Sequence, residues 1–300
     1  MPHDHHHHHH APADNSRLFA IAAALNVAFV GFEGIAGLVT GSLALLADAG
    51  HNLSDVLGLL MAWGAAAMAR RAPGGRRTYG LRKGTILASV ANAVLLLVAV
   101  GIIVWEAVHR FGQPHEIATQ PVMVVAGVGV VLNTATAMMF MRARKEDLNA
   151  RGAFLHMAAD AAISAGVVVA ALAISLTGQL WIDPLVSLVI ALVIVLGTWE
   201  LLRESLDLAM DAAPKGIDPV EVRGWLETLP GVTEVHDLHV WAMSTTETAL
   251  TAHLLRPEGG EPDAFLHDAC AGLSRQFGIG HATLQLETGG ACRLAPADVV

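Results

Sequence analysis

Apolar residues are unevenly distributed along the chain: they fill residues 16 to 212 and become sparse beyond them. Within that part, six stretches are long enough to cross a bilayer as a helix, which takes about 20 mostly apolar residues. They cover residues 16–38, 43–69, 84–109, 120–142, 151–177 and 183–212. The pattern predicts six membrane-spanning helices, and the last continues past the bilayer as an amphipathic stem.

A soluble all-helical protein with buried helices is the alternative. Helices of that kind keep a polar face, whereas residues 93–105, AVLLLVAVGIIVW, have none. The composition agrees with a membrane protein, because the chain is 54% hydrophobic and 15% charged, while an ordinary soluble domain has about 25% charged residues. We therefore expect a membrane all-α bundle of six helices.

Beyond Pro214 the pattern changes to shorter elements. Asp218 and Pro219 are typical of a helix start, and the strand segments alternate between apolar and polar residues. The segments are residues 218–229, 233–244, 248–257, 261–278 and 281–287. Their order, helix–strand–strand–helix–strand (αββαβ), predicts a small α+β domain with helices on one face of a sheet.

The amino terminus reads MPHDHHHHHHAPAD, with no basic region and no cleavage site, so we do not expect it to act as a signal peptide. It is either a purification tag or a native metal-collecting tail. We favour a native tail because His3 interrupts the usual tag pattern. The chain then divides into a His-rich tail (1–15), a six-helix transmembrane domain (16–212) and a C-terminal domain (213–300).

Charge and cysteine content narrow the partners and the compartment. The net charge of −9 disfavours nucleic acid as a partner. The two cysteines, Cys270 and Cys292, are too few for a disulfide framework, so nothing indicates an oxidising compartment.

Basic residues in the short loops predict the orientation, because such loops face the cytoplasm. The loop after the second span holds Arg70, Arg71, Arg76, Arg77, Arg82 and Lys83, and the loop after the fourth holds Arg142, Arg144, Lys145 and Arg151. The first and fifth connections have no basic residue. We expect both termini in the cytoplasm.

Ionisable residues interrupt the second and the fifth span with the same spacing. His51 and Asp55 are four residues apart, and so are His156 and Asp160, so each pair shares a helix face. Such residues are rare inside a membrane and are functional there. Corresponding interruptions in two halves of a bundle indicate a transporter's binding site near the midplane.

The two pairs together fit a divalent cation. Four N and O ligands match tetrahedral zinc, and two carboxylates with two neutral imidazoles balance its charge. Histidines satisfied within the core, or a structural metal, are the alternatives; a site without thiolates suits an ion that must leave. Asp48 is a hydrogen-bond partner of one of these imidazoles, a residue at the external mouth of the site, or a structural residue. Glu33 belongs either to a proton or ion path or to helix packing.

The motifs GSLALLADAGHNLSD, HMAADAAISAG and HDLHVW resemble those of the cation diffusion facilitators over residues 16 to about 292. His51 makes the chain similar to the zinc-preferring bacterial zinc efflux branch. The resemblance implies a homodimeric, proton-coupled exporter in the inner membrane, with His51, Asp55, His156 and Asp160 as transport ligands. It also implies a ferredoxin-like cytoplasmic domain that dimerises and binds metal.

In that domain the resemblance implies His236, His253, His281 and Glu287 as metal ligands, with His267 and Cys292 as weaker candidates; surface histidines without metal are the alternative. His236 and His239 should face opposite sides of their strand, and we interpret His239 as structural. Some relatives bind metal in the loop after the second span, but residues 69–83 have neither Asp nor His. We expect no site there.

We hypothesise that the protein exports Zn²⁺ from the cytoplasm in exchange for protons. Cd²⁺, Co²⁺ and Ni²⁺ are the next candidates, whereas the ligand set disfavours Mn²⁺ and Mg²⁺. A membrane-bound metal sensor that transports nothing would share the binding sites. An intramembrane zinc protease would need a His-Glu-x-x-His motif, which the sequence lacks, so we expect a transporter rather than an enzyme.

Overall fold

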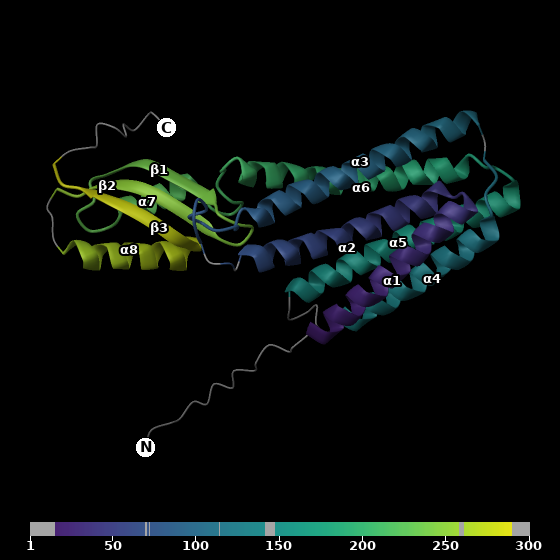
Figure 1. The fold of residues 1–300 in the computed structure, drawn as a ribbon, viewed down its shortest axis with the longest axis horizontal. Helices are drawn as coiled ribbons and strands as arrows, with labels where there is room; N and C mark the ends of the chain where they lie inside the picture. Colours follow the sequence, from purple (N-terminus) through teal and green to yellow (C-terminus); the bar gives the residue numbers. More distant parts are fainter. Residues whose placement is uncertain are drawn as a thin grey trace, which may run out of the picture. The chain divides into compact units, whose positions relative to one another are not determined.

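The structure is a computed structural model that describes residues 16–69, 71, 73–113, 115–141, 148–257 and 261–289. The side chains of several residues in these ranges, Asp55 among them, lie outside the description. Six long helices come first: α1 (Ser16–Thr40), α2 (Leu43–Ala69), α3 (Gly84–Gly112), α4 (Thr119–Phe140), α5 (Leu148–Thr177) and α6 (Ile182–Ala209) (Figure 1). They coincide with the six predicted segments to within a few residues at each end.

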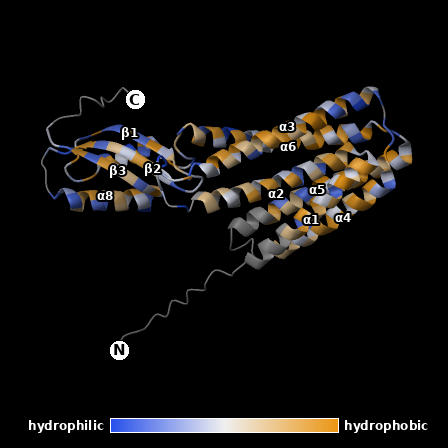
Figure 2. Cartoon of the chain, viewed as in Figure 1, coloured by the Kyte–Doolittle hydropathy of each residue, from blue (hydrophilic) through white to orange (hydrophobic). Residues whose placement is uncertain are grey.

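Helices α3, α4, α5 and α6 contain stretches that are long and apolar enough to cross a membrane. Many of their large apolar side chains point outward, for example Ile102, Val169 and Leu196, each about two-thirds exposed. Figure 2 shows hydrophobic residues along their length. So large an exposed apolar surface would be unfavourable in water, so these faces contact lipid or other protein. The prediction of a transmembrane helical domain is confirmed.

The chain folds as two compact units. The first contains the described residues up to Leu57 together with Leu96–Leu196, and the second contains Gly58–Leu95 and Gly197 onward. The core of the first unit is built from small and branched apolar residues of α2 to α6, such as Leu45, Ala126 and Ala191. A side chain at Gly129 of α4 would lie 2.8 Å from the ring of Phe29 on α1, so this glycine lets the two helices approach closely.

A carboxylate from α6 caps the start of α2 in the first unit. Asp183 accepts hydrogen bonds from the Ser42 hydroxyl (2.6 Å) and from the backbone N–H groups of Leu43 (2.9 Å) and Ala44 (3.3 Å). Unpaired N–H groups at a helix start favour an acceptor of negative charge. Asp183 is 2% exposed, so this buried contact fixes the start of the helix that carries His51.

The C-terminal part has the predicted order α7 (Pro219–Glu227), β1 (Glu234–Ala242), β2 (Thr248–Leu255), α8 (Pro262–Phe277) and β3 (Ile279–Glu287). Strand β2 is central; β1 pairs with it antiparallel and β3 pairs with it parallel. Leu250, Ala252 and Leu254 of β2 share a core with Leu226 of α7 and Leu273 of α8. Both helices therefore cover one face of the sheet (Figure 1), as predicted.

The first helix of this part begins where the sequence predicted. Asp218 caps α7 by accepting a hydrogen bond from the N–H of Val220 (2.8 Å), and Pro219 occupies the first turn. Helix α8 ends at Gly278, whose φ of 68° is the left-handed conformation that favours glycine. These local signals position the sheet whose uncovered face carries the histidines described below.

Candidate metal-binding sites

Helices α2 and α5 bring together three of the four predicted ligands in the first unit. The Nε2 atom of His51 lies 3.5 Å from one carboxylate oxygen of Asp160, and Nε2 of His156 lies 3.7 Å from the other. The two imidazole rings are 6.2 Å apart, centre to centre. The predicted fourth ligand, Asp55, is one turn after His51 on α2, and its side chain lies outside the described part of the chain.

The carboxylate of Asp160 is the centre of this group. Asp160 is fully buried, and neither of its oxygens has a hydrogen-bond partner among the described residues. A buried carboxylate whose oxygens accept no hydrogen bond is costly. A divalent cation between this carboxylate and the two imidazoles would offset that cost, and N and O donors are the ligands that zinc accepts.

A second polar group lies beside the first. The Ser164 hydroxyl on α5 donates to Asp48 Oδ2 on α2 (2.7 Å), and the Asn52 amide donates to Asp48 Oδ1 (3.4 Å) and to Glu33 Oε2 on α1 (3.3 Å). All four side chains are 0% exposed. Asp48 is therefore an interhelical partner rather than a residue at an external mouth, and Glu33 belongs to its network.

The sequence analysis singled out Asp48 and Glu33 but missed Ser164 and Asn52. Ser164 could have been found from its position four residues after Asp160, since that spacing places it on the same face of α5.

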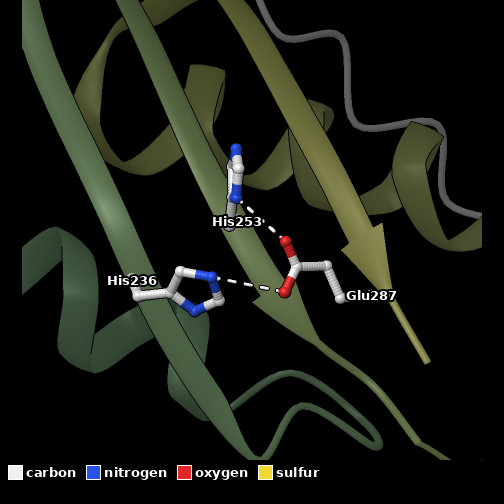
Figure 3. Close-up of side chains that lie close together, drawn as sticks. All are labelled: His236, His253 and Glu287. Atoms are coloured by element: carbon white, nitrogen blue, oxygen red, sulfur yellow. Dashed lines mark ion pairs between the residues drawn. The ribbon is translucent and has the colours of Figure 1, made fainter. Parts of the chain in front are cut away.

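The second unit contains another cluster, on the sheet face that the helices leave uncovered. His236 on β1 pairs with His253 on β2, and Glu287 ends β3 (Figure 3). Glu287 Oε2 lies 3.3 Å from Nε2 of His236, and Oε1 lies 2.9 Å from Nδ1 of His253. One ligand atom from each residue falls within 4.8 Å of the others, so the three side chains could hold one metal ion.

A bulge in β1 shapes this cluster. The register shifts between His236 and His239, and Asp237 has a φ of 49°, an uncommon conformation for a residue other than glycine. Asp237 contacts His239 (2.9 Å) and Nε2 of His253 (3.5 Å). His236 pairs with residue 253 and His239 with residue 251, so both share one sheet face. The prediction that they face opposite sides was wrong, because the bulge adds one residue.

Two of the remaining candidates, His281 and His267, lie outside the cluster. His281 is on the same strand as Glu287 but six residues earlier, about 20 Å away at strand spacing, and its ring instead contacts Tyr79 at 5.7 Å. The geometry therefore does not support His281 as a ligand together with Glu287 within one chain. His267 is exposed on α8, and Cys292 lies outside the described residues.

The sequence matches two family models. Residues 19–208 match the cation efflux transmembrane domain, and residues 214–289 match the cytoplasmic domain of cation efflux proteins. The chain belongs to the cation efflux family. The resemblance inferred from the motifs is confirmed, and both parts of the predicted architecture correspond to domains of this family.

Relatives match over nearly the whole chain. The metal cation efflux system protein CzcD of Cupriavidus metallidurans is 35% identical, covering 99% of this chain and 90% of the relative. The zinc transporter ZitB of Escherichia coli is 36% identical (95% and 91%). The cadmium, cobalt and zinc/H(+)-K(+) antiporter of Bacillus subtilis is 32% identical (96% and 92%). Full-length similarity of this kind makes metal cation efflux the activity class of the chain.

A solved metal-bound C-terminal domain of the CzcD transporter is 33% identical and covers 24% of this chain and 99% of that chain, with a TM-score of 0.23. The likeness to that domain therefore rests on sequence rather than on superposition.

Proposed function

We propose that the protein exports Zn²⁺ from the cytoplasm across the inner membrane in exchange for protons, and that His51, Asp55, His156 and Asp160 carry the ion. The observation that carries this proposal is the fully buried carboxylate of Asp160, which lies 3.5 Å and 3.7 Å from two imidazoles on two helices. An ion bound there lies between α2 and α5, so a change in how these helices pack would change the access to it.

Zinc is the substrate that the donor set favours. Two imidazoles and two carboxylates suit a tetrahedral divalent ion of intermediate softness. Cadmium and cobalt follow, since the names of similar efflux proteins include them beside zinc. The harder ions Mg²⁺ and Mn²⁺ prefer oxygen ligands in octahedral geometry and fit this site poorly.

Charge balance supports exchange with protons. A bound Zn²⁺ with two carboxylates and two neutral imidazoles has a net charge of zero. The empty site returns to zero when both imidazoles take up a proton. Since metal ligands must be deprotonated to bind, protons arriving from the external side would release the metal. The site then never exposes a net charge to the membrane interior, which would be costly.

The basic loops support an orientation with both termini in the cytoplasm. In that orientation the C-terminal sheet is cytoplasmic, and the family description of residues 214–289 agrees with it. We propose that this part also joins two copies of the chain into a homodimer, as the resemblance implies.

The cluster of His236, His253 and Glu287 would then bind cytoplasmic metal. His236 is 1% exposed, and Glu287 is 8% exposed. Metal binding would link side chains of the paired strands β1, β2 and β3 and favour one arrangement of the dimer. A ligand shifts such an equilibrium only if it binds one state better, so we propose that metal at this cluster raises the transport-competent fraction.

Zinc uptake into sealed proteoliposomes under an imposed pH gradient tests the proposal. The unaltered protein should accumulate zinc, and the gradient should drive it. His156→Ala should abolish uptake, whereas the control His267→Ala, at an exposed position on α8, should keep it. Zinc binding without flux in the unaltered protein would instead identify a metal sensor.

A further inference from the structure

The loop between α2 and α3 forms a basic pocket with the end of β1. The pocket has a volume of about 270 Å³, and its lining includes four cationic side chains, Arg76, Arg77, Arg82 and Lys83, and the aromatic side chains of Tyr79 and Trp241. All of these residues belong to the second unit. None belongs to either metal-binding group.

Two of the four cations are already paired. Arg82 contacts Glu247 at 3.1 Å, and Lys83 contacts Asp211 at 2.5 Å. Arg76 and Arg77 are exposed and have no ion pair among the described residues. Residues 70–83 contain no Asp or Glu, so the loop offers these two guanidinium groups no local counter-charge. The pocket therefore has two cations available for an external anion.

The aromatic side chains give the pocket a fixed wall. The Tyr79 ring stands edge-on to the His281 ring of β3, with centroids 5.7 Å apart and planes at 86°. Thr245, close to the end of β1, donates its backbone N–H to the Thr85 hydroxyl at 3.1 Å. A cytoplasmic charge bias explains basic residues in a loop. It does not require them to gather with two aromatic rings around one cavity.

The position of the pocket indicates the anion. Lys83 directly precedes α3, whose apolar length suits a membrane span, so the loop lies at the level of the lipid headgroups. The abundant anion at that level is phosphate, and basic pockets at the ends of spans bind anionic headgroups. Arginine forms paired, charge-assisted hydrogen bonds to phosphate oxygens.

We propose that this pocket binds a phosphate group through Arg76 and Arg77, and that the phosphate is that of an anionic phospholipid headgroup. A bound headgroup would contact the loop and Trp241 together. The bound headgroup would hold the end of β1 at the membrane surface. Binding at this pocket does not depend on the proposed transport of zinc.

The test measures binding of short-chain phosphatidylglycerol and phosphatidylcholine to the full-length protein in a neutral detergent. We expect phosphatidylglycerol to bind more tightly, and Arg76→Gln/Arg77→Gln to weaken its binding by about tenfold or more. The matched control Arg71→Gln/Arg203→Gln removes the same charge at exposed positions outside the pocket and should bind as the unaltered protein does.

Competition with inorganic phosphate distinguishes a pocket that binds free phosphate from one that binds the lipid headgroup. If millimolar phosphate displaces the lipid, the pocket takes free phosphate as well; if it does not, the headgroup and its glycerol are the ligand. The unaltered protein provides a second measurement, because an about tenfold rise in salt should weaken phosphatidylglycerol binding. Equal binding of the two lipids, binding insensitive to salt, or equal affinity of the Arg76→Gln/Arg77→Gln variant would each overturn the proposal.

Discussion

The Ser164 hydroxyl on α5 donates a 2.7 Å hydrogen bond to the Asp48 carboxylate on α2, and both side chains are fully buried. Asp48 is three residues before His51, and Ser164 is four residues after Asp160. This bond therefore connects the two helices about one turn from the proposed ligands, and it fixes how the two halves of the site face each other.

Loss of this bond should weaken metal binding without removing a ligand. Changes to the groups that hold metal ligands in place typically cost about 10- to 100-fold in affinity or activity, so we expect Ser164→Ala to raise the KM for zinc within that range. Ser89→Ala is the control, since that hydroxyl donates its hydrogen bond to the backbone carbonyl of Thr85 on its own helix. An unchanged KM would mean that α2 and α5 are aligned by other contacts.

The cap formed by Asp183 should contribute to stability. Asp183→Ala leaves the Ser42 hydroxyl and two backbone N–H groups of α2 without their acceptor, at a cost of about 2 kcal/mol or more. The thermal midpoint of the purified protein in detergent should fall accordingly. Asp207→Ala, an exposed position on α6, should change the stability by no more than about 0.5 kcal/mol. Equal midpoints for the two variants would show that the cap is dispensable.

The terminal cluster should bind metal through side chains from all three strands. Glu287→Gln removes the carboxylate that contacts both His236 and His253, so we expect the zinc bound per chain at equilibrium dialysis to fall by about one ion. Glu227→Gln is the matched control, because it makes the same change at an exposed position on α7. If Glu287→Gln also leaves the zinc dependence of transport unchanged, the domain serves as a scaffold rather than a regulator.

The thiol of Cys270 should react slowly at neutral pH. Burial on α8 raises the pKa of this thiol, because the thiolate is poorly solvated there. In a Cys292→Ser background, Cys270 is the sole thiol. Its alkylation by iodoacetamide should then reach half its maximal rate at a higher pH in the folded protein than after unfolding, where the pKa is about 8.5. The same pH dependence of the alkylation rate in the folded and the unfolded protein would show that burial does not raise the pKa of Cys270.

Periodicity and spacing were sufficient for much of this molecule. The six long helices follow from apolar runs of membrane length, and the contact between His156 and Asp160 follows from the four-residue spacing that places side chains on one helix face. The αββαβ order follows from alternation and from helix starts such as Asp218. These signals are local, so a single sequence contains them.

The contacts that the sequence analysis missed join distant segments. Ser164 and Asp48 are 116 residues apart, and Ser42 and Asp183 are 141 apart, so no local pattern pairs them. The bulge at Asp237 is a second cause of error, since one inserted residue reverses the facing of every later side chain on β1. His281 was grouped with Glu287 from motif correspondence, and the length of β3 separates them.

The central claim is that α2 and α5 bind one divalent cation between them, and anomalous diffraction from crystals of the full-length protein grown with zinc tests it most directly. The account predicts a zinc peak about 2.0–2.2 Å from a ring nitrogen of His51, a ring nitrogen of His156 and a carboxylate oxygen of Asp160. Zinc at the cluster of His236, His253 and Glu287 alone, with the helical group empty at saturating metal, would contradict it.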